Sequence, residues 1–487
     1  MPRVISNDES LPRQEHAVAS GALTDGTPVI VNSDGTVSVV AGSNVTEAFG
    51  TPVTITPALN FSAVYDPDEQ KVIITYQDSN NSNYGTAIVG TVDASDNSIS
   101  FGTAVVFYSN AVTYTSITYD TASDRIVIAF RGYNGSNYDG IGIIGNVTGS
   151  SISFGSSLLF TSSDSLYINS VYDVTNDKTV IVYRDNDNDD GRAVVATVSD
   201  TTISYGSVVQ FNTSRAIYIK AVYDANAQRV VVSYRDYGNS SYGTSKVGEV
   251  SGTSISFGSA SVFNTASSNH IASVYDASNQ KVVVCYQDGG NSDYGTAVVG
   301  TVDPSDNSIS FGSEVVFESA STDNTSATYD SSLQKVVVCY QDRGNSDYGT
   351  AIVGNVSGTS ITFDTPSVFE QATTTYTASA YDVNANRIVI AYRDEGNSNT
   401  GTAIVFRLAS SSTNVTSENY IGITRSGVAS GAGAIIDIQG AIADNLSGLT
   451  AGQSYFVQAD GTLGTTAADP SVFAGTAVSA TKLIVKG

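Results

Sequence analysis

The chain is poor in the residues on which most enzyme active sites depend. It contains no tryptophan, one methionine, two cysteines and two histidines among 487 residues. His16 and His270 are far apart in the sequence, so we expect neither a Ser-His-Asp triad nor a histidine metal site. Paired carboxylates are able to hydrolyse glycosides, but acidic loops recur along the chain and single out no pair. The sequence therefore favours a non-enzymatic protein.

Charged residues are also scarce, at 14% of the chain, and basic ones are the rarest. The 22 basic and 47 acidic residues give a net charge of −25. Such a chain repels phosphate backbones and anionic membrane surfaces, so we expect no nucleic-acid partner. No apolar run approaches the roughly 18 residues of a membrane span, and the first 20 residues lack the apolar core of a secretory signal. Membrane insertion and signal-dependent export are therefore not expected.

No long segment shows the 3.6-residue period of an amphipathic helix. Val, Ile, Thr, Ser and Tyr dominate instead, with 44 glycines. This composition is typical of twisted sheets and tight turns. We therefore predict an all-β protein.

A repeated segment organises most of the chain. Residues 281–300, KVVVCYQDGGNSDYGTAVVG, predict two strands joined by a polar hairpin. Similar segments begin at Lys71, Arg229, Lys335 and Arg387, and looser ones at Arg125 and Thr179. An aromatic-Asp pair precedes each copy, and successive pairs lie 51 to 54 residues apart. The seven marker aspartates are Asp66, Asp120, Asp173, Asp224, Asp276, Asp330 and Asp382.

Each complete copy contains four expected strands, which is the size of one β-propeller blade. The last copy lacks its fourth strand, whereas residues 45–55, VTEAFGTPVTI, resemble a fourth strand ahead of the first copy. This circular offset predicts a ring closed by an N-terminal strand, because an open solenoid would need capping units instead. We therefore predict a seven-bladed β-propeller over residues 44–408.

The two flanks form separate segments. Residues 1–43 contain a polar arm and a hairpin around Asp34-Gly35, and residues 409–487 read as a β-module. LTAGQSYFVQADGTL in the second flank echoes LTDGTPVIVNSDGTV in the first. Ring closure brings the flanks together, so we expect one small composite β-domain.

The hairpins between the second and third strands are the predicted ligand-binding face. Carboxylates bind sugar hydroxyls, and a tyrosine ring covers the face of a pyranose. The alternative is structural, since Asp and Asn build turns and a tyrosine can pack across a hairpin; the absence of tryptophan also weakens a glycan site. The candidate residues are Asp78, Tyr84, Asp236, Tyr237, Tyr242, Asp288, Tyr294, Asp342, Tyr348 and Asp394.

One irregular hairpin resembles a calcium loop. Within RDNDNDDGR, residues 184–192, Asn186, Asn188 and Asp190 have the spacing of Ca²⁺ ligands, followed by Gly191. The twelfth position holds Thr197 rather than an acidic residue, so an acidic turn is the alternative. No other cofactor is expected.

Residues 448–487 resemble the C-terminal module of structural and tail-fibre proteins of tailed bacteriophages, particularly marine ones. The shared pattern is Gly-Leu-Thr-x-Gly, an aromatic-Val strand, Asp-Gly-Thr and a closing Ser-Ala-Thr-Lys-Leu-Ile-Val. The resemblance implies a virion protein that is released from the host cytoplasm by lysis. It implies other virion proteins as partners, in an oligomeric assembly.

Three roles follow from this resemblance and from the repeats. A tail fibre or tail-associated adhesin would bind a host-surface glycan through the propeller. A head decoration protein would bind the capsid through the flanking β-domain. A polysaccharide-degrading propeller enzyme of the virion is the third alternative.

Overall fold

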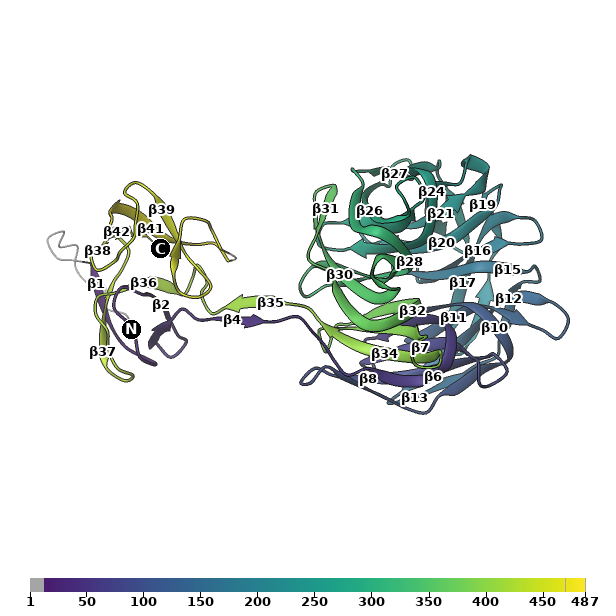
Figure 1. Ribbon diagram of the computed structural model, residues 1–487, viewed down its shortest axis with the longest axis horizontal. Coiled ribbons are helices and arrows are strands. Elements are labelled where there is room, and N and C mark those ends of the chain that lie inside the picture. The colour runs from purple at the N-terminus through teal and green to yellow at the C-terminus, as the bar shows by residue number, and fades with distance from the viewer. Residues whose placement is uncertain (1–12, 469, 487) are drawn as a thin grey trace. The chain divides into compact units, whose positions relative to one another are not determined.

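The computed structural model describes residues 13–468 and 470–486. Apart from the two 3-10 turns η1 (Tyr237–Asn239) and η2 (Arg343–Asn345), each of its regular elements is a strand, so the predicted all-β class is confirmed (Figure 1). Within these residues no helix has the length and apolarity needed to cross a bilayer. The chain divides into two compact units, Ala48–Arg407 and a second unit that combines the flanks up to Glu47 and from Leu408.

The unit Ala48–Arg407 contains seven antiparallel sheets that follow one another in chain order, and we call it the seven-sheet unit. In the fifth sheet, β24 (Ser261–Asp276) pairs with β25 (Lys281–Asp288), β25 with β26 (Tyr294–Asp303), and β26 with β27 (Ser308–Phe311), as the hairpin prediction for residues 281–300 required. Val282, Val283 and Val284 of β25 are fully buried although they alternate between the two faces. Both faces of the second strand are therefore packed, which explains its continuous apolar sequence.

The strands of the seven sheets recur in the same order. The first strands are β6 (Val53–Asp66), β10 (Val105–Asp120), β15 (Ser165–Asp173), β20 (Ala216–Asp224), β24 (Ser261–Asp276), β28 (Val315–Asp330) and β32 (Ser367–Asp382). The second strands are β7 (Lys71–Asp78), β11 (Arg125–Tyr133), β16 (Lys178–Asp185), β21 (Arg229–Asp236), β25 (Lys281–Asp288), β29 (Lys335–Asp342) and β33 (Arg387–Asp394). The third strands are β8 (Tyr84–Asp93), β12 (Tyr138–Thr148), β17 (Asp190–Ser199), β22 (Tyr242–Ser251), β26 (Tyr294–Asp303), β30 (Tyr348–Ser357) and β34 (Thr400–Arg407).

The fourth strand of each sheet is broken in two. Its first part is β9 (Ser98–Phe101), β13 (Ser151–Phe154), β18 (Thr202–Tyr205), β23 (Ser254–Phe257), β27 (Ser308–Phe311) or β31 (Ser360–Phe363). Its second part is β14 (Leu158–Thr161), β19 (Val209–Asn212) or the beginning of the next long first strand, as in β10, β24, β28 and β32.

The seventh sheet takes its outer strand from the beginning of the unit. β5 (Ala48–Phe49) and the start of β6 pair with β34. The seventh and first sheets also meet at their turns, where the Arg387 guanidinium donates hydrogen bonds to Asn97 Oδ1 and to the carbonyl of Ala94. The first and last residues of the seven-sheet unit are thus neighbours in one sheet.

A glycine marks the break in six of the seven outer strands. A Cβ at any of these glycines would collide with a carbonyl oxygen in the turn of the next sheet. The glycine and carbonyl pairs are Gly50 and Asn97, Gly102 and Ser150, Gly155 and Thr201, Gly206 and Thr253, Gly258 and Asn307, and Gly312 and Thr359. The sixth sheet has Asp364 instead, because the seventh sheet ends at Arg407 and has no such turn to approach it.

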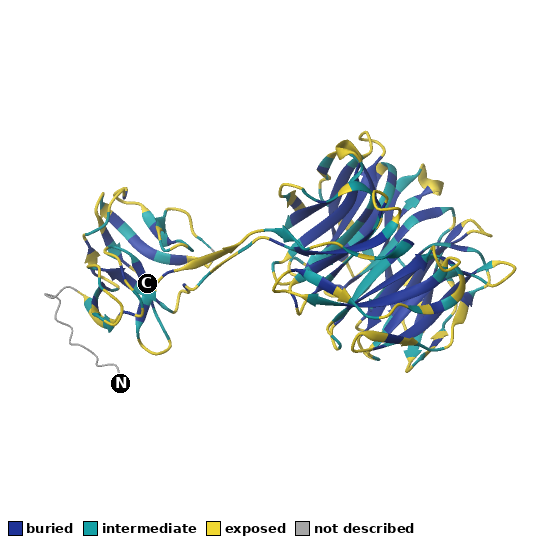
Figure 2. Cartoon of the chain, turned by 60° about the horizontal axis from the view of Figure 1, so that its bottom comes forward, coloured by how far each residue is buried: buried dark blue, intermediate teal, exposed yellow. Residues whose placement is uncertain are grey.

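Aromatic pairs fill the space between the outer strand of one sheet and the second strand of the next sheet. The Phe211 and Tyr234 rings, both nearly inaccessible, lie 5.2 Å apart, and the Phe263 and Tyr286 rings lie 5.1 Å apart. Such tilted and edge-to-face pairs add stabilisation to that of the buried area. Figure 2 shows the result: buried residues run along the strands, and exposed residues gather at the turns.

The seven marker aspartates close the turns between the first and second strands. All seven are buried, and in each turn the carboxylate accepts hydrogen bonds from two backbone N–H groups. Asp276 accepts them from Ser278 and Asn279 at 3.0 Å each, and a third from the Asn279 side chain. The markers therefore recur because the turns need them.

The substitution Asp276→Ala is expected to lower the free energy of unfolding by about 2–3 kcal/mol, because it removes the charged acceptor of three hydrogen bonds in the turn. Asp303→Ala is the matched control, since Asp303 caps an exposed turn through Ser305. Calorimetric unfolding of both variants checks this expectation. Equal losses in the two variants would contradict it.

The flanking unit contains two small sheets and a ribbon. One sheet has the order β1 (Gln14–Val18), β37 (Gly433–Asp437), β36 (Tyr420–Thr424), β2 (Pro28–Val31), β3 (Val37–Val39). The other has the order β38 (Ile442–Ala443), β42 (Lys482–Val485), β41 (Val472–Ser479), β39 (Ser454–Val457), β40 (Leu463–Gly464). The ribbon pairs β4 (Gly42–Val45) with β35 (Ser410–Thr413). Residues 44–47 and Leu408, which the prediction placed in the propeller, therefore belong to the flanking unit.

Candidate functional site

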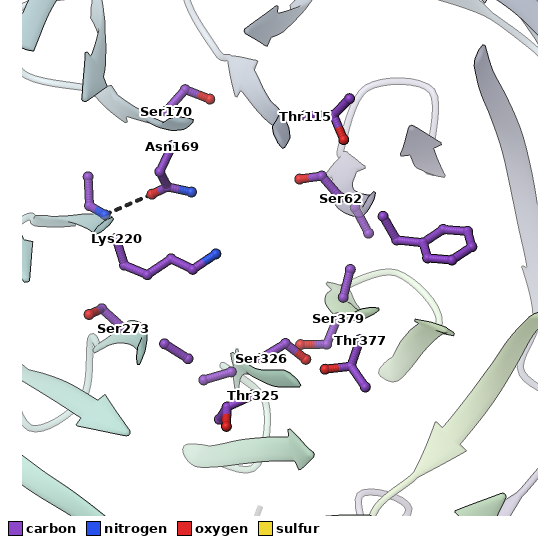
Figure 3. A pocket seen from close by; sticks show the side chains of 16 residues that line it. Ser62, Thr115, Asn169, Ser170, Lys220, Ser273, Thr325, Ser326, Thr377 and Ser379 are labelled. Atoms are coloured by element: carbon purple, nitrogen blue, oxygen red, sulfur yellow. Dashed lines mark hydrogen bonds between the residues drawn. The ribbon is translucent and has the colours of Figure 1, made fainter. Parts of the chain in front are cut away.

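The first strands of all seven sheets line one cavity of about 180 Å³. Its wall consists of serine, threonine, alanine, asparagine and one phenylalanine, with Lys220 as the single charged residue among the lining residues (Figure 3). The hydroxyls of Ser273, Thr325 and Ser326 have no hydrogen-bond partner within the described part of the chain. The cavity wall is therefore polar.

Each first strand has an irregularity in its pairing just before it enters the cavity wall. The register of β20 on β21 shifts between Ile217 and Lys220, and the other six first strands shift at the equivalent place. Such bulges turn a side chain out of the regular alternation of a strand. One residue in each bulge has a left-handed φ, between 46° and 54°. These residues are Asn60, Tyr114, Tyr167, Tyr218, His270, Asn324 and Tyr376.

The seven residues with left-handed φ line a second cavity of about 350 Å³, which we call the mouth. Lys220 and Thr115 belong to the walls of both cavities, so the mouth continues into the inner cavity. A bulky residue with positive φ costs on the order of 1–3 kcal/mol and is found mostly at functional positions. Four tyrosines in this conformation around one cavity therefore point to a binding site.

Four of the aromatic residues of the mouth form one continuous wall. The ring centroids of Tyr114 and Tyr167 lie 5.2 Å apart, those of Tyr167 and Tyr218 5.4 Å, and those of Tyr218 and His270 5.0 Å. All four side chains are half-buried. Half-buried aromatic rings offer an apolar surface together with a polar edge, which suits a flat ligand that carries hydroxyl groups.

A second row of side chains holds two asparagines of the mouth and the neighbour of His270 in place. These side chains come from the second strands, at the position before the hairpin aspartate. Gln77 Oε1 accepts a hydrogen bond from Asn60, Gln341 Oε1 accepts one from Asn324, and Arg235 donates one to Asn269 Oδ1. These contacts preorganise part of the mouth.

The fourth sheet gives one sector of the mouth a positive charge. The guanidiniums of Arg215 and Arg235 lie 4.5 Å and 4.7 Å from the centre of the Tyr237 ring, within the range of cation–π contacts. Burial raises the pKa of the neighbouring Tyr167 phenol, and the guanidiniums of Arg184, Arg215 and Arg235 oppose that rise. These cations are therefore close enough to act on the mouth.

His270 is held as a neutral imidazole. Its Nδ1 accepts the backbone N–H of Asn324 at 3.1 Å, and its Nε2 lies 3.4 Å from Asp323 Oδ1. Burial lowers the pKa of His270; the Asp323 carboxylate opposes this effect and Arg343 adds to it. Nδ1 is then an acceptor and Nε2 the donor, which fixes the ring in the mouth.

Stability at mildly acidic pH is expected to depend on this histidine. Because the folded pKa lies below the unfolded value of 6.5, the contribution is complete above pH 6.5 and is lost as the pH falls through the folded pKa. His270→Asn, which places there the residue found at positions 60 and 324, should lose less stability than wild type between pH 7 and pH 5. Thermal unfolding at both pH values measures the difference, and parallel losses would contradict the assignment.

The predicted hairpin aspartates turn inward to shape their own loops. Asp236, Asp288, Asp342 and Asp394 are buried. Each of them, like Asp78, accepts a backbone N–H two or three residues ahead in its loop. This is the structural alternative that the sequence left open.

The predicted hairpin tyrosines divide into two groups. Tyr84, Tyr242, Tyr294 and Tyr348 begin their third strands and are half-buried. Tyr237 is 39% exposed, contacts two guanidiniums and acts electrostatically on Tyr167 and Tyr218 of the mouth. Of the ten predicted residues, Tyr237 is the one that the structure associates with this site.

The irregular hairpin does not bring its oxygen atoms together as a calcium loop does. Asn186 and Asn188 donate their amide N–H groups to Asp164 and Asp185, and Asp190 is paired with Arg192. Within residues 13–468 and 470–486 no three acidic, histidine or cysteine side chains form a group that could hold a metal ion. The hairpin thus has the geometry of an acidic turn that basic and amide groups stabilise.

The mouth was missed from the sequence although a signal for it exists. Each of the seven residues with left-handed φ stands six positions before a marker aspartate, and this position holds tyrosine in four copies, asparagine in two and histidine in one. Our interpretation weighted what the copies share. Variation at a fixed position of a repeat would have indicated this site.

Comparison with known proteins supports the fold and assigns no family. No family model matches the chain, and no curated protein matches it. A lectin from Burkholderia pseudomallei, BP39L, is similar in structure, with a TM-score of 0.52 at 11% identity, over 74% of this chain and 99% of the lectin. A Dyadobacter fermentans protein of unknown function is similar with a TM-score of 0.46 at 11% identity, over 76% of this chain and 99% of that protein. AofleA from Arthrobotrys oligospora is similar with a TM-score of 0.43 at 9% identity, over 74% of this chain and 95% of AofleA.

Proposed function

We propose that the seven-sheet unit is a closed seven-bladed β-propeller and that its mouth binds a saccharide. Two observations support the propeller: the first strands of all seven sheets line one cavity, and the N-terminal strand pairs with the last sheet. The saccharide role rests on one observation, the continuous wall formed by Tyr114, Tyr167, Tyr218 and His270. Rings of this kind stack on the apolar face of a pyranose while nearby amides bind its hydroxyls.

We further propose that the protein is a non-enzymatic virion component of a tailed bacteriophage, a tail fibre or tail-associated adhesin. The resemblance of residues 448–487 to phage structural proteins supports the virion location. A saccharide-binding mouth supports attachment to a host surface over decoration of the head. The similar Burkholderia pseudomallei protein is described as a lectin, and a lectin-like activity is proposed for this chain from the mouth's chemistry.

A glycan array tests the binding role with the full chain. Tyr218→Ala is expected to weaken binding about tenfold, because an aromatic contact contributes on the order of 1 kcal/mol beyond its area. Tyr242→Ala is the matched control, since Tyr242 lies in the hairpin and does not line the mouth. Loss of binding in Tyr242→Ala alone would move the site to the hairpin face, and a wild-type chain that binds no glycan would refute the binding role.

Immunogold labelling of phage particles tests the location, with an antibody raised against the seven-sheet unit. Label at the tail is the expected result. Label over the head would overturn the adhesin role in favour of capsid decoration.

A further inference from the structure

Lys220 is an exception in the cavity wall. It stands four residues before a marker aspartate, where the other sheets have serine, asparagine or alanine. Its side chain extends into the inner cavity, and Lys220 also lines the mouth (Figure 3). The corresponding residues are Ser62, Ser116, Asn169, Ala272, Ser326 and Ala378.

The Lys220 ammonium has no counter-ion in the cavity. Among the described residues its Nζ forms no hydrogen bond or ion pair, and burial alone accounts for its lowered pKa. An unpaired cation in a confined site destabilises a fold, so natural proteins keep one mainly where a ligand or a reaction uses it. An amine without a partner at this place favours an anionic group in the cavity, because an anion there would stabilise the charged form of the amine.

The nearest cations of the fourth sheet are also free of carboxylate partners. Arg215 and Arg235 contact the Tyr237 ring and form no ion pair within the described residues. Arg131 and Arg184 of the second and third sheets, in contrast, are paired with Asp164 and Asp189. The uncompensated charge is thus concentrated where Tyr218 and Lys220 lie, in a chain whose net charge is −25.

Size and overall charge restrict the ligand further. A mouth of about 350 Å³ is at the lower end of the range of about 300–1,000 Å³ that is usual for small-molecule sites. A polyanion such as nucleic acid would be repelled by the rest of the chain. A saccharide unit with a single acidic group satisfies the local charge without that penalty.

We propose that the mouth recognises an acidic saccharide, whose ring packs against Tyr167 and Tyr218 and whose carboxylate or sulfate group is bound by the Lys220 ammonium. Arg215 and Arg235, which lie outside the lining of the mouth, add electrostatic attraction for the acidic group. This inference rests on the proposed saccharide-binding function and specifies the ligand class of the same site. Lys220 would act as the residue that distinguishes acidic from neutral sugars.

Isothermal titration calorimetry of the full chain tests this inference with three probes. These are galacturonic acid, galactose, which is its carboxyl-reduced form, and galactose 6-sulfate, which carries a sulfate and no carboxylate. We expect galacturonic acid to bind about tenfold or more tightly than galactose, because a charge-assisted hydrogen bond is lost on reduction. Tighter binding of galactose 6-sulfate than of galacturonic acid would assign the anionic group as sulfate.

Two variants and a control identify the role of Lys220. Lys220→Met and Lys220→Ser are expected to lose the preference for the acidic form, and serine is already present at this position in three other sheets. Lys246→Met is the control, because Lys246 lies in the same sheet and lines neither cavity. Its binding should equal that of wild type.

The outcomes separate this inference from the proposed function. Equal binding of the acidic and reduced forms, or an unchanged preference in both Lys220 variants, overturns the acidic-saccharide inference and leaves saccharide binding intact. A wild-type chain that binds none of these probes and no glycan on the array refutes both.

Discussion

An oxidised Ala48→Cys/Arg407→Cys variant is expected to have a free energy of unfolding about 3 kcal/mol above that of its reduced form. Ala48 and Arg407 are register partners in the pairing of β5 with β34. Antiparallel partners have Cα atoms about 4.5–5.5 Å apart, within the range that a disulfide bridges. The bond would close a loop of nearly the whole seven-sheet unit and so restrict the unfolded chain strongly.

Differential scanning calorimetry of the oxidised and reduced variant measures the gain. The native cysteines do not interfere, since Cys285 and Cys339 are both buried and free. Ala48→Cys alone controls for the substitution itself. If the two introduced thiols fail to oxidise in the folded protein, the strand pairing that joins the first and seventh sheets is wrong.

Gly206→Ala is expected to destabilise the seven-sheet unit by about 3 kcal/mol, near the upper end for overpacking. The added Cβ would meet the carbonyl oxygen of Thr253, which belongs to the backbone and cannot rotate away. Neighbouring sheets would have to separate to accommodate it. The same change at Asp364, Asp364→Ala, should alter stability by less than about 0.5 kcal/mol because that side chain is exposed.

Thermal unfolding of these two variants measures both effects. Similar losses in Gly206→Ala and Asp364→Ala would show that the close approach of neighbouring sheets is not what the glycine serves. A Gly206→Ala variant with wild-type stability would have the same meaning. The two variants therefore test why glycine recurs in six outer strands and is replaced by Asp364 in the sixth sheet.

The all-β class and the hairpins of the repeat were predictable because their signals are local. The segment at residues 281–300 predicts β25 and β26, since its apolar β-branched runs flank a polar turn. Repetition strengthened each of these signals. Seven related copies reduce the ambiguity that a single short strand carries.

The mouth could not be predicted in the same way. The bulge of the first strand is a shift of one residue inside a sequence that reads as a continuous strand, and the left-handed φ of Tyr218 leaves no mark in composition. The repeated pattern favoured the hairpin aspartates as the site instead, because they recur in most copies. A carboxylate that caps a turn and one that binds a ligand are the same residue in a sequence, and only burial and hydrogen bonds separate them.

Under the proposed binding function, the left-handed bulges give this scaffold a capacity to change specificity. Seven side chains project from backbone positions of one conformation, and that conformation already holds asparagine, tyrosine and histidine. Substitutions there alter the shape and chemistry of the mouth while the turn aspartates and outer-strand glycines keep the sheets in place. A lineage under pressure to follow a changing target therefore needs neither insertions nor loop remodelling, because point substitutions at seven fixed positions suffice.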